Sequence, residues 1–373
     1  MTSALAREGV VRIGIIGVGR VGQSRIATYA DIEGAEVVAC ADVNEGFAAR
    51  AARKYDIPHV YKNFRELLAR DDIDAVDICL HNNFHMPVTL AAFAAGKHVC
   101  SEKPMAGSFR DAEAMIAAAK EHRCKLHIEL SALYTNETLA AQELIEKGEL
   151  GEIYHARSTG FRRRGRPFVD GYRTAPFVQK RFSGGGALYD MGTHHVAQVL
   201  YLLGNPRVLR ISGQIYQKTE MDERRRSASG YDVEELGAGF VRLEKGVTLD
   251  VVEAWAAHID GFGGSVLLGE RSGIRLQPFG FFKSVGNLDI DATVDLEAAR
   301  RRFDQVRGDS GAYASSAAHW IAALRGRVPL LPTADLALRT MLVTEGMYLS
   351  AKFGREVTAE EVATVSVSTA IDG

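Results

Sequence analysis

Three side chains in two separate motifs could move a proton and hold a small ligand. Lys103 lies in the motif SEKP directly after a short apolar run, and Asp190 and His194 stand four apart in a segment with helical spacing. A lysine at the carboxyl end of a parallel strand lies in the crevice where such sheets bind ligands, so Lys103 is a candidate proton acceptor. Residues four apart in a helix share one face, so Asp190 and His194 could contact one ligand. Taken alone, a solvated lysine and a core histidine are the plainer interpretations.

The elements that would position Lys103 alternate between β-rich runs and helical stretches from residue 11 to about 130. The β-rich runs are VRIGIIG, AEVVACAD, IDAVDICL, KHVCSEK and KLHIEL, with alanine-rich segments between them. This alternation is typical of βαβ units and a parallel, doubly wound sheet. We therefore predict an N-terminal α/β domain of the Rossmann type over residues 1-128, which binds a dinucleotide.

After about residue 150 the pattern changes to longer β-rich stretches, including IYHARSTGF, VLRISGQIY and GAGFVRLEKGVTLDVVEAWAA. These predict an α+β domain built on a large, mostly antiparallel open sheet. Helices are expected at Ala187 to Leu203, Ser315 to Leu324 and Ala334 to Phe353. A chain of 373 residues exceeds one usual domain, so we assign residues 129-373 to a substrate-binding and oligomerisation domain. Its C-terminal helices are candidates to pack back on the first domain.

Composition excludes several classes of partner. The formal net charge is only -2, so no global charge draws the protein to nucleic acid or to a membrane. The N-terminal apolar run is short and broken by glycines, which suits neither a signal peptide nor a membrane span and leads us to expect a cytoplasmic protein. The four cysteines lack the short paired spacings of a zinc site, so no metal is expected and buried thiols are the preferred interpretation.

A glycine-rich motif, GVGRVG at residues 17–22, follows the first predicted strand and opens a helical segment. In this context G-x-G-x-x-G predicts that a pyrophosphate lies at the helix N-terminus, although a flavin or nucleotide-sugar remains an alternative. Asp42 ends the second strand 20 residues beyond the motif, where its carboxylate would bind both ribose hydroxyls and repel a 2′-phosphate, which favours NAD over NADP. The candidate cofactor contacts are Gly17, Gly19, Arg20, Val21, Gly22 and Asp42.

Three motifs together resemble those of the glucose-fructose oxidoreductase, inositol dehydrogenase and MocA (Gfo/Idh/MocA) family. They are HNNFH at residues 81–85, SEKP at 101–104 and GGGALYDMGTH at 184–194, and the resemblance runs from about Val11 to Val357. It implies a Rossmann domain followed by an open-sheet domain that handles carbohydrates. His81 stands where the family commonly has proline, Leu133 where it often has arginine and Ala197 where it often has an acid. The departure at His81 affects only the local turn, whereas those at Leu133 and Ala197 weaken the transfer of any particular substrate.

The resemblance also implies roles for individual residues. Asn82 and His85 match the family's cofactor-side motif, and Glu102 would contact the nicotinamide ribose. Lys103 would point at the reacting hydroxyl, and the bond to Pro104 would be cis.

Within the third motif, His194 could share the proton of the hydroxyl that is oxidised, and Asp190 could orient the sugar ring. His195 is rotated about 100° further round the helix; we interpret it mainly as a core histidine and keep it, with Tyr134, as a candidate substrate contact.

A basic stretch, FRRRGRPFVDGYRTAPFVQKRF, precedes the third motif. One interpretation is a solvated or subunit-contacting loop. The other is that guanidinium groups, with Arg164 and Arg166 as candidates, bind an anionic group of the substrate while Tyr172 stacks on its ring.

Three functions compete at this point. The first is an NAD-dependent dehydrogenase that acts on a hydroxyl of a sugar, sugar acid or polyol. The second, implied by a branch of the family, is an NAD-dependent glycosidase that oxidises, eliminates, hydrates and re-reduces its substrate while NAD stays bound. The third is a non-catalytic dinucleotide-binding sensor, which the intact SEKP motif, Asp190 and His194 disfavour. The exposed face of the second sheet predicts a homodimer or homotetramer.

Overall fold

The computed structural model describes residues 9–306 and 309–372. Its first sheet has six strands in the order β3-β2-β1-β4-β5-β6, and all pairings are parallel, which confirms the predicted parallel, doubly wound sheet. Both faces of this sheet are covered, which is why its central strands read as nearly continuous apolar runs. The strands are β1 (Val11–Ile16), β2 (Ala35–Ala41), β3 (His59–Tyr61), β4 (Ala75–Ile78), β5 (His98–Ser101) and β6 (Leu126–Ile128). The helices are α1 (Arg20–Ala30), α2 (Glu45–Tyr55), α3 (Phe64–Leu68), α4 (His85–Ala94) and α5 (Phe109–Glu121).

The strand order reverses between β1 and β4, and this reversal positions the candidate site. In a doubly wound sheet a crevice opens at the carboxyl ends of the strands where the order reverses. The segments that follow β1, β4 and β5 are the glycine-rich motif, the HNNFH motif and the SEKP motif. All three therefore meet at one edge of the sheet.

The second sheet has nine strands in the order β14-β13-β12-β11-β7-β10-β9-β8-β15, and only β7 and β10 pair in parallel among its described pairings. This confirms the predicted mostly antiparallel sheet. One face is packed and the other is open, as the alternating burial along β8 shows. The strands are β7 (Ile153–Phe161), β8 (Val208–Tyr216), β9 (Leu236–Leu243), β10 (Thr248–Ala254), β11 (Val266–Gly269), β12 (Gly273–Arg275), β13 (Gly280–Val285), β14 (Leu288–Ala292) and β15 (Val357–Thr358).

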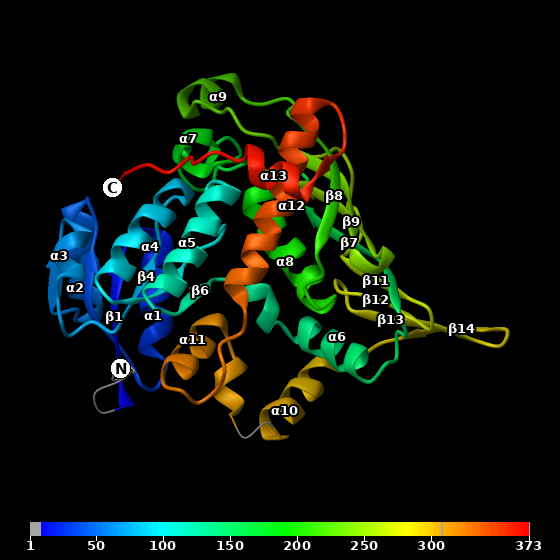
Figure 1. Ribbon diagram of the computed structural model, residues 1–373, viewed down its shortest axis with the longest axis horizontal. Helices are drawn as coiled ribbons and strands as arrows, with labels where there is room; N and C mark the ends of the chain where they lie inside the picture. The colour runs from blue at the N-terminus through cyan, green and yellow to red at the C-terminus, as the bar shows by residue number, and fades with distance from the viewer. Residues whose placement is uncertain (1–8, 307–308, 373) are drawn as a thin grey trace.

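One long helix from the C-terminal part of the chain, α12 (Thr333–Phe353), lies between the two sheets. Figure 1 shows α12 running between the Rossmann part and the second sheet, where it packs against β8 and α8 on one side and α5 and β6 on the other. Among the described residues, no helix combines the length and apolar character needed to cross a membrane. The remaining helices are α6 (Asn136–Glu146), α7 (Lys180–Ser183), α8 (Thr193–Leu202), α9 (Glu223–Ser229), α10 (Leu296–Val306), α11 (Ser316–Leu324), α12 (Thr333–Phe353) and α13 (Ala359–Val365).

The helix that carries the third motif differs from the prediction. The segment expected as one helix from Ala187 to Leu203 begins with a turn of π-helix, Leu188–Gly192, before α8 continues as a regular α-helix. A π-turn holds one residue more than an α-turn, so it changes which side chains share a face. Asp190 lies inside this wider turn and His194 lies beyond it.

Candidate active site

The glycine-rich motif has the backbone that a dinucleotide needs. Gly17 has φ +90°, a conformation that favours glycine, and a Cβ at Gly22 would lie 2.0 Å from the Gly17 carbonyl oxygen. A Cβ at Gly19 would meet nothing within 4 Å, and no side chain caps α1, whose first residues Arg20 and Val21 are exposed. Open space in front of uncapped N–H groups fits a pyrophosphate.

Asp42 lies beside this motif at the end of β2. Its Oδ2 accepts a hydrogen bond from the Val18 backbone N–H at 2.9 Å, and its Oδ1 accepts one from the Asn44 N–H at 2.8 Å. The carboxylate is thus fixed next to the glycine turn. This is the place from which an acid could meet the adenosine ribose, and that role stays a prediction.

Arg25 forms an ion cluster that sequence reasoning missed. From α1 it reaches Glu102 Oε1 at 2.5 Å, Glu129 Oε2 at 2.8 Å and Asp77 Oδ2 at 3.1 Å. Burial raises the pKa of Asp77 and Glu129 even though Arg25 opposes the shift. The three acids end β4, β5 and β6, so only the sheet order brings them together. The result fixes Glu102, and with it the backbone that leads to Lys103.

Lys103 and Asp190 meet across the two domains. The Lys103–Pro104 peptide bond is cis, as the resemblance implied. The Lys103 ammonium donates to the Asp190 backbone oxygen at 2.6 Å and to its Oδ1 at 3.1 Å. Residues 87 positions apart thus form one site at the carboxyl end of β5.

Asp190 is the centre of a second ion cluster. Its carboxylate accepts hydrogen bonds from Arg173 Nη1 at 2.8 Å, Arg162 Nη1 at 3.3 Å and Trp255 Nε1 at 3.0 Å. Burial alone would raise the pKa of Asp190, but Lys103, Arg173 and Arg162 together lower it well below its ordinary value. Asp190 therefore stays ionised. Sequence reasoning placed Arg162 and Arg173 in the basic stretch without singling them out.

The two histidines of the third motif have different surroundings. His194 is half-buried, and its buried Nδ1 has no hydrogen-bond partner within the described part of the chain. Burial and the charge of Lys103 lower its pKa well below the ordinary value, so the ring is neutral. His195 instead pairs with Glu253, Nδ1 to Oε2 at 2.9 Å, and both lie in space that Gly160 leaves free. His195 is thus held by protein, which fits the core interpretation better than a substrate contact.

The HNNFH motif is hydrogen-bonded to other parts of the protein, and the cofactor contacts expected of Asn82 and His85 stay predictions. The His85 ring is fully buried, with Nδ1 2.9 Å from Pro104 O and Nε2 3.1 Å from Leu80 O. Asn82 Nδ2 donates to Ser183 O at 2.6 Å. His85 therefore positions the SEKP turn, and Asn82 ties the first domain to α7.

The two arginines expected to bind an anion do not reach this site. Arg166 is buried, and its five N–H groups are taken up by Asp170, Glu235, Thr219 and the backbone of residue 220. Such a guanidinium has no donor left for a ligand. The Arg164 side chain is 76% exposed and pairs with Asp170 at 3.3 Å. The anion hypothesis therefore cannot rest on Arg166, and for Arg164 it stays a prediction.

Tyr172 lies at the Asp190 cluster, with two guanidinium groups close to its ring. Arg162 lies 5.4 Å and Arg173 5.8 Å from the ring centre, and the Tyr172 hydroxyl accepts from Arg162 and donates to Gly165 O. Burial raises the pKa of Tyr172 to about 12. The Tyr172 ring already packs against these two arginines. A sugar that stacked on the ring, as expected, would have to bind beside them.

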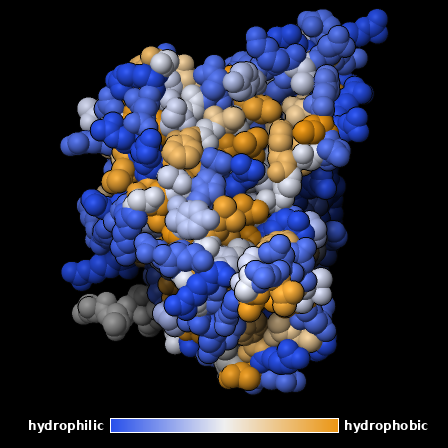
Figure 2. Space-filling model, turned by 90° about the vertical axis from the view of Figure 1, so that its right-hand side faces the viewer, coloured by the Kyte–Doolittle hydropathy of each residue, from blue (hydrophilic) through white to orange (hydrophobic). Residues whose placement is uncertain are grey.

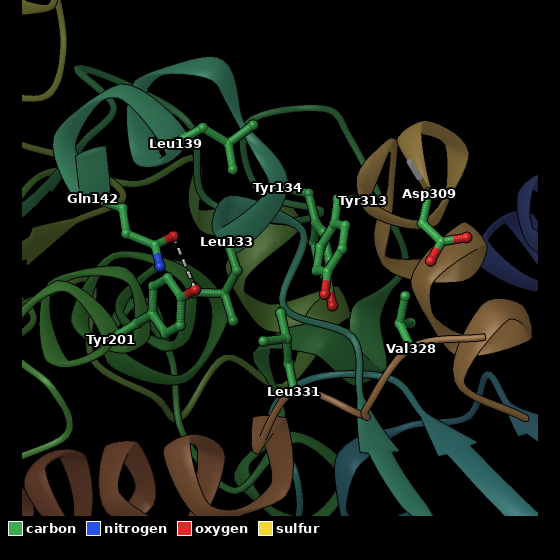
Figure 3. A pocket seen from close by; sticks show the side chains of 9 residues that line it. All are labelled: Leu133, Tyr134, Leu139, Gln142, Tyr201, Asp309, Tyr313, Val328 and Leu331. Atoms are coloured by element: carbon green, nitrogen blue, oxygen red, sulfur yellow. Dashed lines mark hydrogen bonds between the residues drawn. The ribbon is translucent and has the colours of Figure 1, made fainter. Parts of the chain in front are cut away.

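Tyr134 faces a different cavity. It lines a pocket of about 390 Å³ between η3 (Ser131–Tyr134), α6, the second half of α8 and the 309–331 segment. Figure 3 shows Tyr134 and Tyr313 lining this pocket, with Tyr201 hydrogen-bonded to Gln142 at one side of it. Tyr134 thus lines a cavity whose lining residues do not include Lys103, Asp190 or His194, and its role as a substrate contact stays a prediction.

Lys103, His194 and Asp190 together offer a base, a neutral imidazole and a fixed carboxylate next to a dinucleotide-binding motif. A hydroxyl placed between Lys103 and His194 could lose its proton to one and be held by the other. Hydride transfer to a nicotinamide is the chemistry that this combination suits.

Comparisons with known proteins agree with this geometry. Residues 11–130 match the model described as oxidoreductase family, NAD-binding Rossmann fold, and residues 138–274 match the GFO/IDH/MocA C-terminal domain. The D-glucoside 3-dehydrogenase of Escherichia coli is 26% identical over 329 residues, which cover 86% of this chain and 90% of that protein. The levoglucosan dehydrogenase of Pseudarthrobacter phenanthrenivorans is 30% identical over 170 residues, 44% of this chain and 42% of that one.

A solved structure of levoglucosan dehydrogenase in complex with NADH has the same fold, with a TM-score of 0.78 at 20% identity over 94% of this chain and 99% of the other. The chain is therefore a member of the Gfo/Idh/MocA family of NAD(P)-dependent oxidoreductases.

Proposed function

We propose that this protein is an NAD-dependent dehydrogenase that oxidises a hydroxyl of a sugar, sugar acid or polyol. The observation that carries the proposal is the contact of Lys103 Nζ with Asp190, beside the unpaired Nδ1 of His194. The names of two similar proteins, a D-glucoside 3-dehydrogenase and a levoglucosan dehydrogenase, support a carbohydrate substrate.

Each residue has one task in this reaction. As the free amine, after it has released its own proton to solvent, Lys103 takes the hydroxyl proton. His194 donates a hydrogen bond to the same oxygen, and Asp190 keeps the Lys103 side chain in place. NAD supplies the hydride acceptor when it is bound. The cofactor would lie along Gly17, Gly19 and the first turn of α1, with Glu102 at the nicotinamide ribose.

The test is a substrate screen with two parallel readouts. Purified protein is incubated with NAD and a panel of neutral and acidic sugars, polyols and aryl glycosides, while NADH absorbance and aglycone release are followed. Stoichiometric NADH from a free sugar or polyol is the expected result. Aglycone release with NAD in trace amounts and no NADH build-up would instead assign the glycosidase. Neither signal across the panel would contradict both enzymes and favour the sensor.

We also propose that the chain assembles through the open face of its second sheet. Large exposed hydrophobic side chains lie on β7, β8, β13 and β14, and Figure 2 shows hydrophobic atoms gathered across the middle of this side of the molecule. Such patches commonly mark subunit contacts. Light scattering after size exclusion should give a mass of two or four chains, and a Leu288→Glu, Ile290→Glu variant should shift it toward one.

A further inference from the structure

The Asp190 cluster holds more positive charge than its own carboxylate can balance. Lys103, Arg162 and Arg173 all lie within 3.3 Å of Asp190 oxygens. Three cations against one carboxylate leave a formal surplus of two positive charges. His194 does not change this balance, because its lowered pKa keeps it neutral, and His195 is paired with Glu253.

This surplus charge faces open space. The Asp190 side chain is 9% exposed, whereas the Arg162 and Arg173 side chains are 34% and 29% exposed. Each arginine uses Nη1 to reach Asp190, and Nη2 of each has no hydrogen-bond partner in the described residues. Both guanidinium groups thus bridge from the buried carboxylate to the outside, with donors left over.

The two guanidinium groups are fixed in place rather than loosely solvated. Both pack on the Tyr172 ring, and Arg173 also lies 4.7 Å from the Phe177 ring centre. Arg173 has φ +62°, a backbone conformation that a non-glycine residue adopts only where the surroundings hold it. Arginines held in this way bind carboxylates well because little entropy is lost on binding.

We propose that the substrate carries a carboxylate, which Arg162 and Arg173 bind while Lys103 and His194 act on a hydroxyl of the same molecule. This inference rests on the proposed dehydrogenase function and narrows its substrate to sugar acids and related hydroxy acids. A planar carboxylate accepts two N–H bonds from a guanidinium fork, and both arginines already bind one carboxylate, that of Asp190, from the protein side. A second carboxylate on the open side would neutralise part of the surplus.

The test compares acids with their neutral counterparts on the NADH-loaded protein, in which no turnover occurs. Binding is measured by calorimetry for D-glucuronate against D-glucose, D-galacturonate against D-galactose and D-gluconate against sorbitol. We expect at least one acid to bind at least tenfold more tightly than its counterpart, with the difference shrinking as salt is added. If no acid in the three pairs binds more tightly than its neutral counterpart, the proposal is overturned.

Variants locate the effect. Arg162→Gln and Arg173→Gln should each weaken binding of the preferred acid at least tenfold and leave its neutral counterpart within about threefold, while Arg173→Lys keeps part of the affinity. The matched control is Arg163→Gln, since Arg163 is exposed in the same stretch. Thermal unfolding confirms that each variant folds. Equal acid affinity in wild type and in both glutamine variants would contradict the proposal even if an acid binds tightly.

The two proposals fail in different ways. An acid that binds through these arginines but yields no NADH with NAD contradicts the dehydrogenase and leaves the carboxylate site standing. The opposite result is a neutral sugar that is oxidised as fast as its acid, with turnover that Arg162→Gln and Arg173→Gln do not change. That result supports the dehydrogenase and contradicts the carboxylate site.

Discussion

Two ion clusters flank the place where the nicotinamide would lie, and they are charge-inverted versions of one another. On the Rossmann side, one cation, Arg25, meets three carboxylates. On the side of the second domain, one carboxylate, Asp190, meets three cations. Glu102 and Lys103 are neighbours in the chain, yet each belongs to a different cluster.

The clusters differ most in their access to solvent. In the Arg25 cluster every side chain is at most 15% exposed, so its groups satisfy one another and hold the SEKP backbone. In the Asp190 cluster two of the three cations are about one third exposed. We call the buried Arg25 cluster closed and the partly exposed Asp190 cluster open. The closed cluster holds its side chains in place, whereas side chains of the open cluster can bind a ligand in place of a protein group. We therefore expect defects in folding from the first and defects in catalysis from the second.

The largest effect should come from removing Lys103 from the open cluster. Lys103→Ala should lower turnover of the substrate found in the screen by about 10²- to 10⁴-fold, because the proton acceptor is lost, and should change the NADH dissociation constant little. Steady-state kinetics and fluorescence titration measure the two quantities. Lys120→Ala, an exposed lysine on α5, is the control. Near-normal turnover in Lys103→Ala would remove this residue from the mechanism.

Removing the cation of the closed cluster should affect stability instead. Arg25→Met leaves three carboxylates buried without a counter-ion and should lower the free energy of unfolding by about 3 to 5 kcal/mol. The pKa values of Asp77 and Glu129 are already raised, so protonation favours the folded state as the pH falls. The loss in Tm should thus be smaller at pH 5.5 than at pH 8. Arg53→Met on the exposed face of α2 is the control, and a pH-independent loss would contradict this account.

Asp42 differs from the carboxylates of both ion clusters, because backbone N–H groups rather than a guanidinium bind it. We expect NAD to bind at least tenfold more tightly than NADP, since a 2′-phosphate beside this carboxylate should cost about 1.4 kcal/mol or more. Calorimetric titration with both cofactors measures this, and Asp42→Ser should narrow the gap. Equal affinities in wild type would mean that Asp42 does not face the ribose.

The smallest effect concerns the His195–Glu253 pair at the edge of the open cluster. Burial lowers the pKa of His195, but Glu253 more than offsets this, and the net pKa is raised. A raised histidine pKa stabilises the fold below about pH 6.5, and this contribution is lost as the pH rises through the raised value. Glu253→Gln should therefore lower the free energy of unfolding by about 1 kcal/mol more at pH 6 than at pH 9, as measured by urea denaturation. A gap that does not vary with pH would exclude this titration.

The sequence predicted what depends on local periodicity and on motifs. Strand patterns predicted both sheets and the place of Asp42 at the end of β2. The spacing of the glycines predicted the turn after β1, because few other residues fit that backbone. Lys103 and Asp190 could be paired before the structure only because a family resemblance linked their motifs.

What the sequence did not predict depends on partners far away in the chain. The Arg25 cluster exists because β4, β5 and β6 are neighbours, which no local pattern states. From the sequence, Arg166 is a candidate to bind an anion. In the structure it is paired with Glu235, which lies 69 residues later in the chain. Arg162 and Arg173 reach Asp190 from the loop that follows the end of β7 at Phe161.

The π-turn at Leu188–Gly192 makes the active site sensitive to insertions and deletions rather than to substitutions alone. Each residue of a regular α-helix advances the chain by about 100°, so deleting one residue from this turn would restore α-geometry and swing Asp190 away from Lys103 while α8 stayed packed. A loss of one codon could thus dismantle the cluster and leave the fold intact. Alignments of related chains should carry a one-residue gap here wherever the three cations have lost their shared carboxylate.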